Sequence, residues 1–484
     1  MNRILKKVLI SLGILFSLIT IVLVILIIRA YNYGFNYKNG DNIPDNVILE
    51  EDGNNIDTIK AVGRGLYDAD GNRFQIKGVN FGNWLIQEGW MTVMSVGAKY
   101  NDDGTYFKVN DDGIVEEYEE IYQEELMDIL QSRVERGDFT QEQLDALWDA
   151  YYDSYCQEQD FINIKKLGLN TIRLPMYYRN FMEGPDEQLV MKDNAFERID
   201  WFLEMAKKYN LFVVLDMHGV VGGQSGFEHS GTRDNEFWDN EVYQNEMCFL
   251  WKSIALHYIN DRPDLAYTIL AYDLVNEPAT ATTSTGKKQW DVMDKMYDAI
   301  REVDKEHIIS IEGVWFFNSL PDPAKYGWEN VLYQGHFYNW NNPTISFDAF
   351  YTLMWQTLSM ADYEVPRYIG EFTFFNDEKS WIKYLNLFDD MGIGWTFWSY
   401  KTISVGWWDS SWGLYVQKMN LDNKDKNGNV IITNDPTKDR LKLDVNTATY
   451  EQLYEEWSKQ ETWRCYNPKG MYSYIVKYFE SKQQ

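Results

Sequence analysis

Apolar and polar positions along the chain fall into two alternating kinds of segment. Short runs rich in β-branched and aromatic residues, such as LFVVLDMHG (211–219), alternate with longer stretches that repeat apolar residues every three or four positions, such as DNAFERIDWFLEMAKKYN (193–210). Near-continuous apolar strands between amphipathic helices are typical of parallel strands covered by helices. The pattern predicts eight strands, at residues 73–81, 170–176, 211–219, 267–277, 307–315, 331–338, 367–375 and 392–400.

Eight such units predict an α/β fold, a (β/α)8 TIM barrel built from residues 60–484. A doubly wound open sheet is the alternative, but such sheets usually carry a glycine-rich nucleotide-binding turn, and no GxGxxG follows a predicted strand. Two stretches interrupt the pattern. Residues 94–150 are acidic and helix-prone, which predicts a helical insertion after the first strand, and residues 417–447 are polar, which predicts a surface segment.

The N-terminus has the pattern of a membrane anchor. Residues 8–28 are apolar and uncharged, a run long enough to span the roughly 30 Å core of a bilayer as a helix. More positive charge precedes the run than follows it, which favours an N-terminus inside the cell. We expect a single-pass transmembrane signal-anchor at 1–30, a tether at 31–59 and an extracellular catalytic domain. Cleavage of a long signal peptide, which would give a secreted protein, is the alternative.

Charge and composition exclude some partners. The chain has 45 Lys and Arg against 74 Asp and Glu, a formal net charge of −29, so its surface repels phosphate backbones and we expect no nucleic-acid partner. The three cysteines and five histidines show no metal-binding spacing, so we expect no metal or other cofactor. Aromatic residues make up 16% of the chain, with 19 Trp, which suits a large core and also a cleft where sugar rings stack on indoles.

Polar residues gather where the predicted strands end. The fourth strand, for example, closes with YDLVNEPA (272–279), which places an amide and a carboxylate directly after an apolar run. Alone, such a residue is equally a polar strand terminator before a proline. In a TIM barrel, however, the C-terminal strand ends line the active site. There the sequence places Asn80, Arg173, His218, Asn276, Glu277, His336, Tyr338, Glu371 and Trp398.

Two of these residues are carboxylates, Glu277 after the fourth strand and Glu371 in the seventh, on roughly opposite sides of the barrel mouth. Cleavage of a glycosidic bond requires such a pair, because one carboxyl donates a proton to the leaving oxygen while the other acts on the anomeric carbon. The alternative for Glu371 is a structural ion pair with Arg173. The sequence therefore predicts a glycosidase, with an inactive carbohydrate-binding barrel as the non-enzyme alternative.

The motifs NTIRLP, LDMHG, NEP, HFY, GEF and GWTFW occur in one order over about residues 72–413 and resemble glycoside hydrolase family 5. The resemblance implies that Glu277 is the general acid/base and Glu371 the nucleophile of a retaining, double-displacement mechanism. It further implies that Asn276 binds the sugar 2-hydroxyl and that Arg173 lies beneath the nucleophile and keeps it ionised.

The same resemblance implies roles for four aromatic residues of the site. His336 and Tyr338 orient the two carboxylates, His218 contacts the sugar beside the scissile bond, and Trp398 forms the floor of that subsite and precedes a cis peptide. A general acid is expected to have a raised pKa, which here means Glu277.

Two stretches, KGVNFGNWLIQEGWM and DMHGVVGGQSGFEHSG, are similar to the exo-β-1,3-glucanase branch of the family. That likeness implies that Glu88 helps to close a pocket around a terminal glucose. The chain departs from the branch at Asn83 and Gly89, where the branch usually has Gly and Pro, and in the insertion at 94–150. The expected function is a membrane-anchored extracellular β-glucan hydrolase, with an endo-β-1,4-glucanase, a mannanase or a glycolipid-cleaving enzyme as alternatives.

Overall fold

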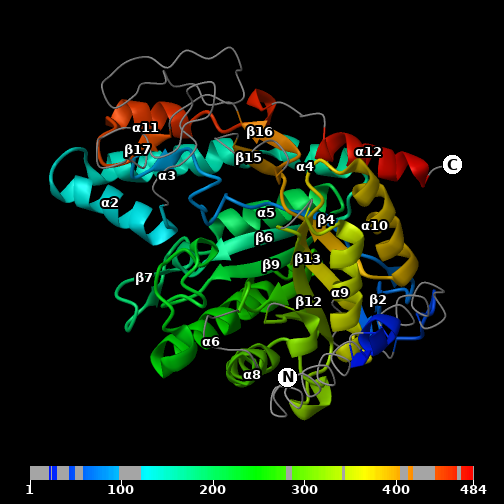
Figure 1. Ribbon diagram of the computed structural model, residues 1–484. Helices are drawn as coiled ribbons and strands as arrows, with labels where there is room; N and C mark the ends of the chain where they lie inside the picture. Colours follow the sequence, from blue (N-terminus) through cyan, green and yellow to red (C-terminus); the bar gives the residue numbers. More distant parts are fainter. Residues whose placement is uncertain are drawn as a thin grey trace, which may run out of the picture.

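The computed structural model describes residues 21–22, 24–29, 43–49, 58–97, 121–278, 286–314, 316–340, 344–403, 412–417, 442–465 and 470–482. Eight parallel strands close into a barrel within these residues (Figure 1). Each matches one predicted strand, so the TIM-barrel prediction is confirmed and the open-sheet alternative is wrong. In chain order the strands are β4 (Lys77–Asn80), β6 (Thr171–Tyr177), β9 (Phe212–Gly219), β10 (Ile269–Asp273), β11 (Ile308–Glu312), β12 (Val331–Tyr338), β13 (Arg367–Thr373) and β14 (Gly394–Phe397).

Most of the strands are followed by an α-helix that packs its apolar stripe on the barrel. In α8 (Lys287–Arg301), for example, Met293, Met296 and Ile300 recur at helical spacing and are buried. The described residues 316–330, between β11 and β12, hold two short 3-10 turns in place of an α-helix. The other helices around the barrel are α4 (Glu158–Lys166), α5 (Glu197–Lys208), α6 (Glu241–Leu256), α7 (Pro263–Ala266), α9 (Phe347–Met360), α10 (Glu378–Met391) and α12 (Met471–Ser481).

A small antiparallel sheet covers the N-terminal end of the barrel. It consists of β1 (Lys60–Val62), β2 (Gly65–Tyr67) and β3 (Arg73–Phe74), and the predicted first strand is therefore divided between β3 and β4. Apolar residues from this sheet and from the strand beginnings form one buried cluster, which includes Ile59, Leu66, Ile76, Val214, Leu270, Ile308 and Leu332. The cluster seals this end, so the polar strand ends meet at the opposite end.

The predicted insertion is helical and forms a lobe beside the barrel. Its helix α3 (Gln141–Tyr155) packs against the C-terminal helix α11 (Tyr450–Trp457) on one side and against α2 (Gln123–Glu135) on the other (Figure 1). The short strand β5 (Met94–Ser95) pairs in parallel with β17 (Leu443–Asp444). Part of the predicted insertion and most of the predicted polar segment at 417–447 lie outside the described residues.

The predicted membrane anchor falls almost wholly outside the described residues. Residues 21–22 and 24–28, which are described, are helical. Among the helices that the structure describes, none combines the length and apolar character needed to cross a bilayer.

Candidate active site

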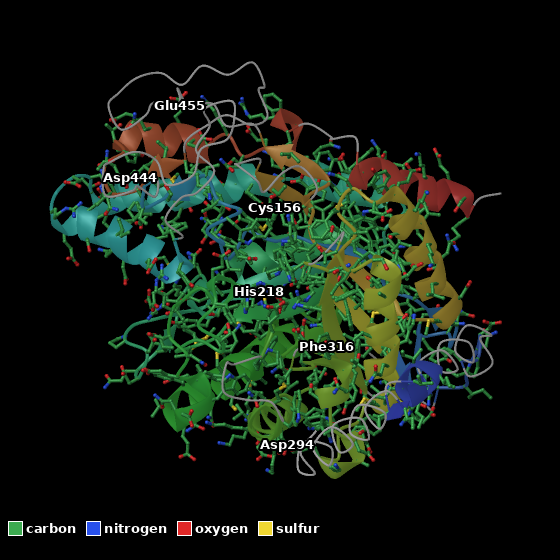
Figure 2. All side chains as sticks on the ribbon, in the orientation of Figure 1. Cys156, His218, Asp294, Phe316, Asp444 and Glu455 are labelled. Atoms are coloured by element: carbon green, nitrogen blue, oxygen red, sulfur yellow. The ribbon has the colours of Figure 1, made fainter. Side chains whose placement is uncertain are left out.

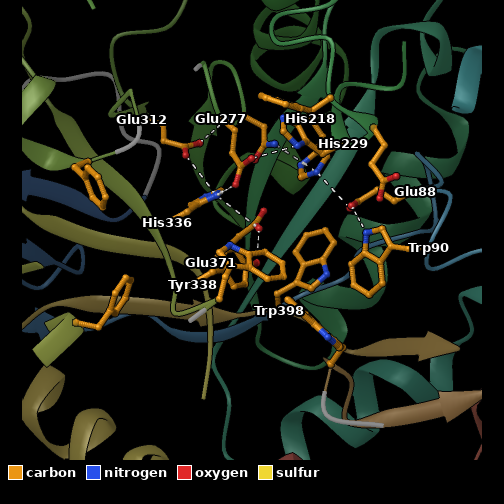
Figure 3. A pocket seen from close by; sticks show the side chains of 17 residues that line it. Glu88, Trp90, His218, His229, Glu277, Glu312, His336, Tyr338, Glu371 and Trp398 are labelled. Carbon is orange, nitrogen blue, oxygen red and sulfur yellow. Dashed lines mark hydrogen bonds and ion pairs between the residues drawn. The ribbon is translucent and has the colours of Figure 1, made fainter. Parts of the chain in front are cut away.

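A cavity of about 550 Å³ opens at the C-terminal ends of the strands (Figure 3). Figure 2 labels one of the cavity residues, His218, which lies near the C-terminal end of β9. Of the ten residues that the sequence predicted for the site, all but Asn80 and Arg173 line this cavity. Its lining consists of Glu88, Trp90, His218, Phe227, Glu228, His229, Asn276, Glu277, Glu312, Phe316, His336, Tyr338, Trp340, Phe350, Glu371, Trp398 and Trp412.

The two predicted carboxylates face each other across the cavity. Side-chain oxygens of Glu277 and Glu371 and a ring nitrogen of His336 all lie within 4.8 Å of one another. Retaining glycosidases hold their two carboxyl groups about 5–5.5 Å apart, which leaves room for the anomeric carbon and excludes an interposed water. The arrangement can therefore support direct attack by one carboxylate while the other handles the proton.

Glu371 is buried and held by charge and by hydrogen bonds. Arg173 donates from Nη1 to its Oε1 at 2.7 Å, and the Tyr338 hydroxyl donates to its Oε2 at 2.7 Å. Both donors hold the carboxylate in one orientation. These contacts aim one of its oxygens into the cavity, as a nucleophile requires.

Arg173 lies fully buried inside the barrel below Glu371. Besides Glu371 it contacts two further carboxylates, Asp273 at 2.9 Å and Asp216 at 3.0 Å, and it donates to Asn276 Oδ1 at 2.9 Å. A buried guanidinium of this kind is stable only because its donors meet charged or polar acceptors. Asp216 and Asp273 were missed by the sequence analysis, although each is an acid inside an otherwise apolar strand.

Asn80 ends β4 below the cavity and does not line it. Its Oδ1 accepts from Arg173 Nη1 at 3.1 Å, and its Nδ2 donates to the carbonyl of Gly370 at 2.8 Å. The expectation that Asn80 lines the site is therefore not met, because Asn80 pairs in register with Arg173 of β6 and lies in the same layer below the cavity. Its side chain supports the site from beneath.

Glu277 adopts an unusual backbone conformation, with a φ of 39° that residues other than glycine rarely take. Its Oε1 lies 2.9 Å from Nδ1 of His336, and its Oε2 lies 3.2 Å from Nδ1 of His229. Burial raises the pKa of Glu277, but the two histidines lower it by a larger amount, so this pKa lies below its usual range. The expectation of a raised pKa for Glu277 is therefore wrong for the unliganded site.

His218 and Trp398 form one wall of the cavity. The His218 ring stacks on the Trp398 indole, with centroids 5.6 Å apart, and its Nδ1 lies 2.7 Å from Asp216 Oδ2. Burial lowers the pKa of His218, but the Asp216 carboxylate outweighs this and raises it to about 10. The peptide bond from Trp398 to Ser399 is cis, as the family resemblance implied.

Glu88 closes the same side of the cavity. Its Oε1 lies 3.8 Å from Nε2 of His218, and its Oε2 accepts from the Trp90 indole nitrogen at 2.8 Å. Trp90 in turn packs edge-on against Trp412, with centroids 5.1 Å apart. The contacts give this side a continuous wall, which Figure 3 shows for Glu88, Trp90 and Trp398.

Three polar residues of the cavity were missed by the sequence analysis, Glu228, His229 and Glu312. Glu312 is the last residue of β11, so the rule that selected Glu277 and Glu371 should also have selected it. His229 lies in the loop after β9, and only the folded chain brings it to Glu277.

Glu277, His336 and Glu371 have side-chain atoms close enough together to hold a metal ion. The Nδ1 of His336, however, faces three carboxylates, at 2.9 Å from Glu277, 3.4 Å from Glu312 and 3.6 Å from Glu371. A ring nitrogen in that position carries a proton, and a protonated nitrogen cannot coordinate a metal. The chemistry of this donor set is that of proton transfer.

The model of the Cellulase family, described as glycosyl hydrolase family 5, matches residues 134–404. This is more than half of the chain, so the chain belongs to glycosyl hydrolase family 5. The prediction from the motifs is thus confirmed, and with it the class of the protein as a glycoside hydrolase.

Curated relatives share parts of the chain. It is 28% identical over 286 residues to a beta-xylosidase of Phanerodontia chrysosporium, a match covering 58% of this chain and 52% of that protein. It is 30% identical over 246 residues to glucan 1,3-beta-glucosidase I/II of Saccharomyces cerevisiae, covering 49% of this chain and 48% of that protein. The chain spans about half the length of these relatives.

Solved structures show a more distant likeness. A rutinosidase from Aspergillus niger matches with a TM-score of 0.48 and 16% identity, covering 68% of this chain and 90% of that chain. Endoglucanase Cel5A from Thermotoga maritima matches with a TM-score of 0.41 and 20% identity, covering 54% and 85%.

Proposed function

We propose that the protein is a retaining β-glycosidase that hydrolyses β-glucans, with Glu371 as nucleophile and Glu277 as general acid/base. The observation that carries this proposal is the approach of the two carboxylates to within 4.8 Å across an open cavity. That spacing suits a covalent glycosyl-enzyme intermediate and does not leave room for the water of an inverting mechanism.

In the first step, Glu371 attacks the anomeric carbon and the bond from that carbon to the leaving oxygen breaks. The leaving oxygen takes the proton of Glu277, and the sugar becomes an ester of Glu371. In the second step, water attacks the anomeric carbon, the Glu277 carboxylate takes its proton, and Glu371 departs as a carboxylate. Asn276, at the cavity wall and bonded to Arg173, is placed to bind the sugar 2-hydroxyl.

The proton for the first step has a source beside Glu277. His336 is buried, which lowers its pKa, but the surrounding carboxylates, Glu312 first among them, raise it to about 9. At neutral pH its Nδ1 therefore holds a proton 2.9 Å from Glu277 Oε1. A substrate that displaces water from the cavity favours the neutral form of Glu277, so we propose that this proton passes along the hydrogen bond as substrate binds.

The wall formed by Glu88, Trp90 and Trp412 favours a pocket over an open cleft, and thus removal of a terminal sugar. The names of the matched relatives, glucan 1,3-beta-glucosidases and a beta-xylosidase, are consistent with such action. We therefore propose an exo-β-1,3-glucosidase activity.

A glycoside with an apolar aglycone, such as a glycolipid, is the second candidate. Phe227 and Trp340 line the cavity and are 44% and 59% exposed, which is unusual for large aromatic side chains. Exposed rings at the rim suit an apolar leaving group as well as a second sugar.

We further propose that the domain acts outside the cell on a membrane anchor. The support for this is the apolar run at residues 8–28 and the charges around it. Protease added to intact cells should remove the domain and leave an N-terminal stub in the membrane fraction, whereas release of the whole protein into the medium would favour a cleaved signal peptide.

The function is tested by incubating the purified protein with laminarin, cellooligosaccharides, β-mannan and an aryl β-glucoside, and separating the products by size over time. Glucose as the sole early product from laminarin is the expected result. Mixed oligomers from any of the polymers would show endo action, and hydrolysis of a glycolipid alone would favour the second candidate. Proton NMR of the first-formed sugar should show the β-anomer, because two displacements restore the configuration.

A further inference from the structure

Glu312 is a third carboxyl group beneath the two that face each other across the cavity. It is the last residue of β11, next along the barrel from β10, which leads into Glu277. Its side chain is only 2% exposed, yet it reaches the cavity floor. A buried carboxyl with no role in the proposed displacement steps requires an explanation, since burying one is costly.

The contacts of Glu312 converge on Glu277. Its Oε2 accepts the backbone N–H of Glu277 at 2.8 Å, and it also faces Gln334 Nε2 at 3.3 Å. Its Oε1 lies 3.4 Å from His336 Nδ1, the same nitrogen that bonds Glu277 Oε1. One carboxyl group therefore touches both the backbone of Glu277 and the side chain that orients its carboxylate (Figure 3).

The backbone contact matters because of the conformation it holds. Glu277 has a φ of 39°, and residues in that region persist only when surrounding contacts fix them. The peptide N–H of Glu277 points into the protein, where Glu312 supplies its acceptor. Loss of that acceptor would leave a buried donor unpaired and would free the backbone to relax.

Charges from four other strands face Glu312. Three of these strands contribute the groups that act on Glu312: Glu277 follows β10 and Asp273 lies in it, Arg173 lies in β6 and His336 in β12. The fourth, β13, carries Glu371, which faces the same nitrogen of His336 at 3.6 Å. Burial raises the pKa of Glu312 to about 8, with the positive charge of His336 opposing and the negative charge of Glu277 adding to the rise. The pKa of Glu312 therefore lies far above that of an ordinary glutamate, and its ionisation falls within the pH range in which the enzyme can be assayed.

We propose that Glu312 is a positioning residue whose carboxyl group fixes the backbone of Glu277 and shares His336 with it, so that Glu277 meets the leaving oxygen. This rests on the proposed function, because it assumes that Glu277 is the proton donor. Ionisation of Glu312 would place a second full negative charge on the His336 N–H and draw that N–H away from Glu277.

Two variants of the full-length protein separate this role from a structural one. E312Q keeps an oxygen acceptor for the Glu277 N–H but cannot ionise, and E312A removes the acceptor. The matched control is E306Q, because Glu306 is also buried and lies just before the other end of β11. Melting temperatures identify any variant that fails to fold. If E312A fails to fold, E312Q still tests the proposal.

The readout is kcat/KM for aryl β-glucosides whose leaving groups range from good to poor, measured across pH 5 to 9.5. E312A should lose about 10- to 100-fold on poor leaving groups and less than about threefold on good ones, because only the poor ones need the acid. E312Q should retain activity at pH 6 and lose the fall in activity that the wild-type protein shows near pH 8.

Three outcomes would overturn the proposal: equal losses on all leaving groups in E312A, an unchanged alkaline limb in E312Q, or the same changes in E306Q. Failure of the proposed function has a different signature. In that case the wild-type protein itself would hydrolyse none of the glucosides, or E277Q would show no dependence on the leaving group.

Discussion

Arg173 donates to Glu371 at 2.7 Å in the barrel interior, although the two residues lie 198 positions apart in the chain. The same guanidinium also meets Asp216 and Asp273, and neither Arg173 nor those two aspartates has any exposed side-chain surface. Three carboxylates thus share one cation, so the proposed nucleophile is held within a buried charge network. The ion pair with Arg173, which the sequence offered as the alternative for Glu371, is present, and it is compatible with the proposed role of Glu371 as nucleophile.

Replacing Arg173 by Lys should destabilise the fold and the site together. A single ammonium cannot meet three carboxylates that a planar guanidinium contacts at once, so buried charges lose their partners. We expect a loss of about 3–5 kcal/mol in the free energy of unfolding, measured with urea. The control is Arg136→Lys, whose exposed pair with Asp138 should leave the free energy of unfolding nearly unchanged. Equal, small effects of both substitutions would show that the stability of the fold does not depend on the contacts of Arg173 with the three carboxylates.

The two glutamates should respond differently to amide substitution. Glu277→Gln removes the proton donor, so hydrolysis of poor leaving groups should fall by about 10²- to 10⁴-fold while good leaving groups are spared in kcat/KM. Glu371→Gln removes the nucleophile and should be severe for every substrate, by about a thousandfold or more. The measurement is kcat/KM over a series of aryl glycosides. Mild losses of equal size in both variants would refute the assignment.

The sequence predicted the barrel well because every strand is both apolar and β-prone, whatever its neighbours. Strand-end chemistry was predicted for the same reason, since the C-terminal ends of parallel strands must meet. This reasoning failed at Asn80, whose register with Arg173 leaves its side chain below the cavity. It also failed at residues 316–330, where short turns replace the usual helix.

Long-range contacts explain what the sequence could not predict. The lowered pKa of Glu277 depends on His229, which arrives from the loop after β9 and has no sequence relation to NEP. The burial of Asp216 and Asp273 depends on their sharing Arg173, and an acid within an apolar strand shows no such partner in the sequence. The role of Glu312 emerges only when its distance to the Glu277 backbone is known.

Stability should fall as pH rises, in part because of Glu312. The folded-state pKa of Glu312 is about 8, above the usual value of about 4.3, so between these values the folded protein binds more protons than the unfolded chain. This neutral carboxyl therefore contributes stability at low pH that is lost as pH rises toward 8. His336 and His218, with pKa values of about 9 and 10, add a loss of the same sign above about pH 6.5.

A comparison of melting temperatures isolates the contribution of Glu312. Between pH 5 and pH 8.5, the melting temperature of the wild-type protein should fall by more than that of E312Q, because the glutamine side chain does not ionise. His218 is common to both proteins and cancels in the difference. His336 does not cancel, because Glu312 helps to raise its pKa, but its smaller shift in E312Q changes the difference in the same direction. Parallel curves for the two proteins would show that Glu312 is already ionised at neutral pH.

The helical insertion should affect substrate binding through Tyr151 of α3. This buried hydroxyl donates to the carbonyl of Asn83 and accepts from its Nδ2 at 3.3 Å, and Asn83 Oδ1 accepts the backbone N–H of Glu88 at 3.1 Å. Tyr151→Phe should therefore loosen the Glu88 wall and raise KM for glucosides about three- to tenfold, with kcat nearly unchanged, at a cost of about 1 kcal/mol in stability. The control is Tyr297→Phe, which removes a hydroxyl bonded to the Glu329 carbonyl at 3.2 Å on α8 and should cost similar stability without raising KM. An unchanged KM in Tyr151→Phe would show that the insertion stabilises the barrel without shaping its pocket.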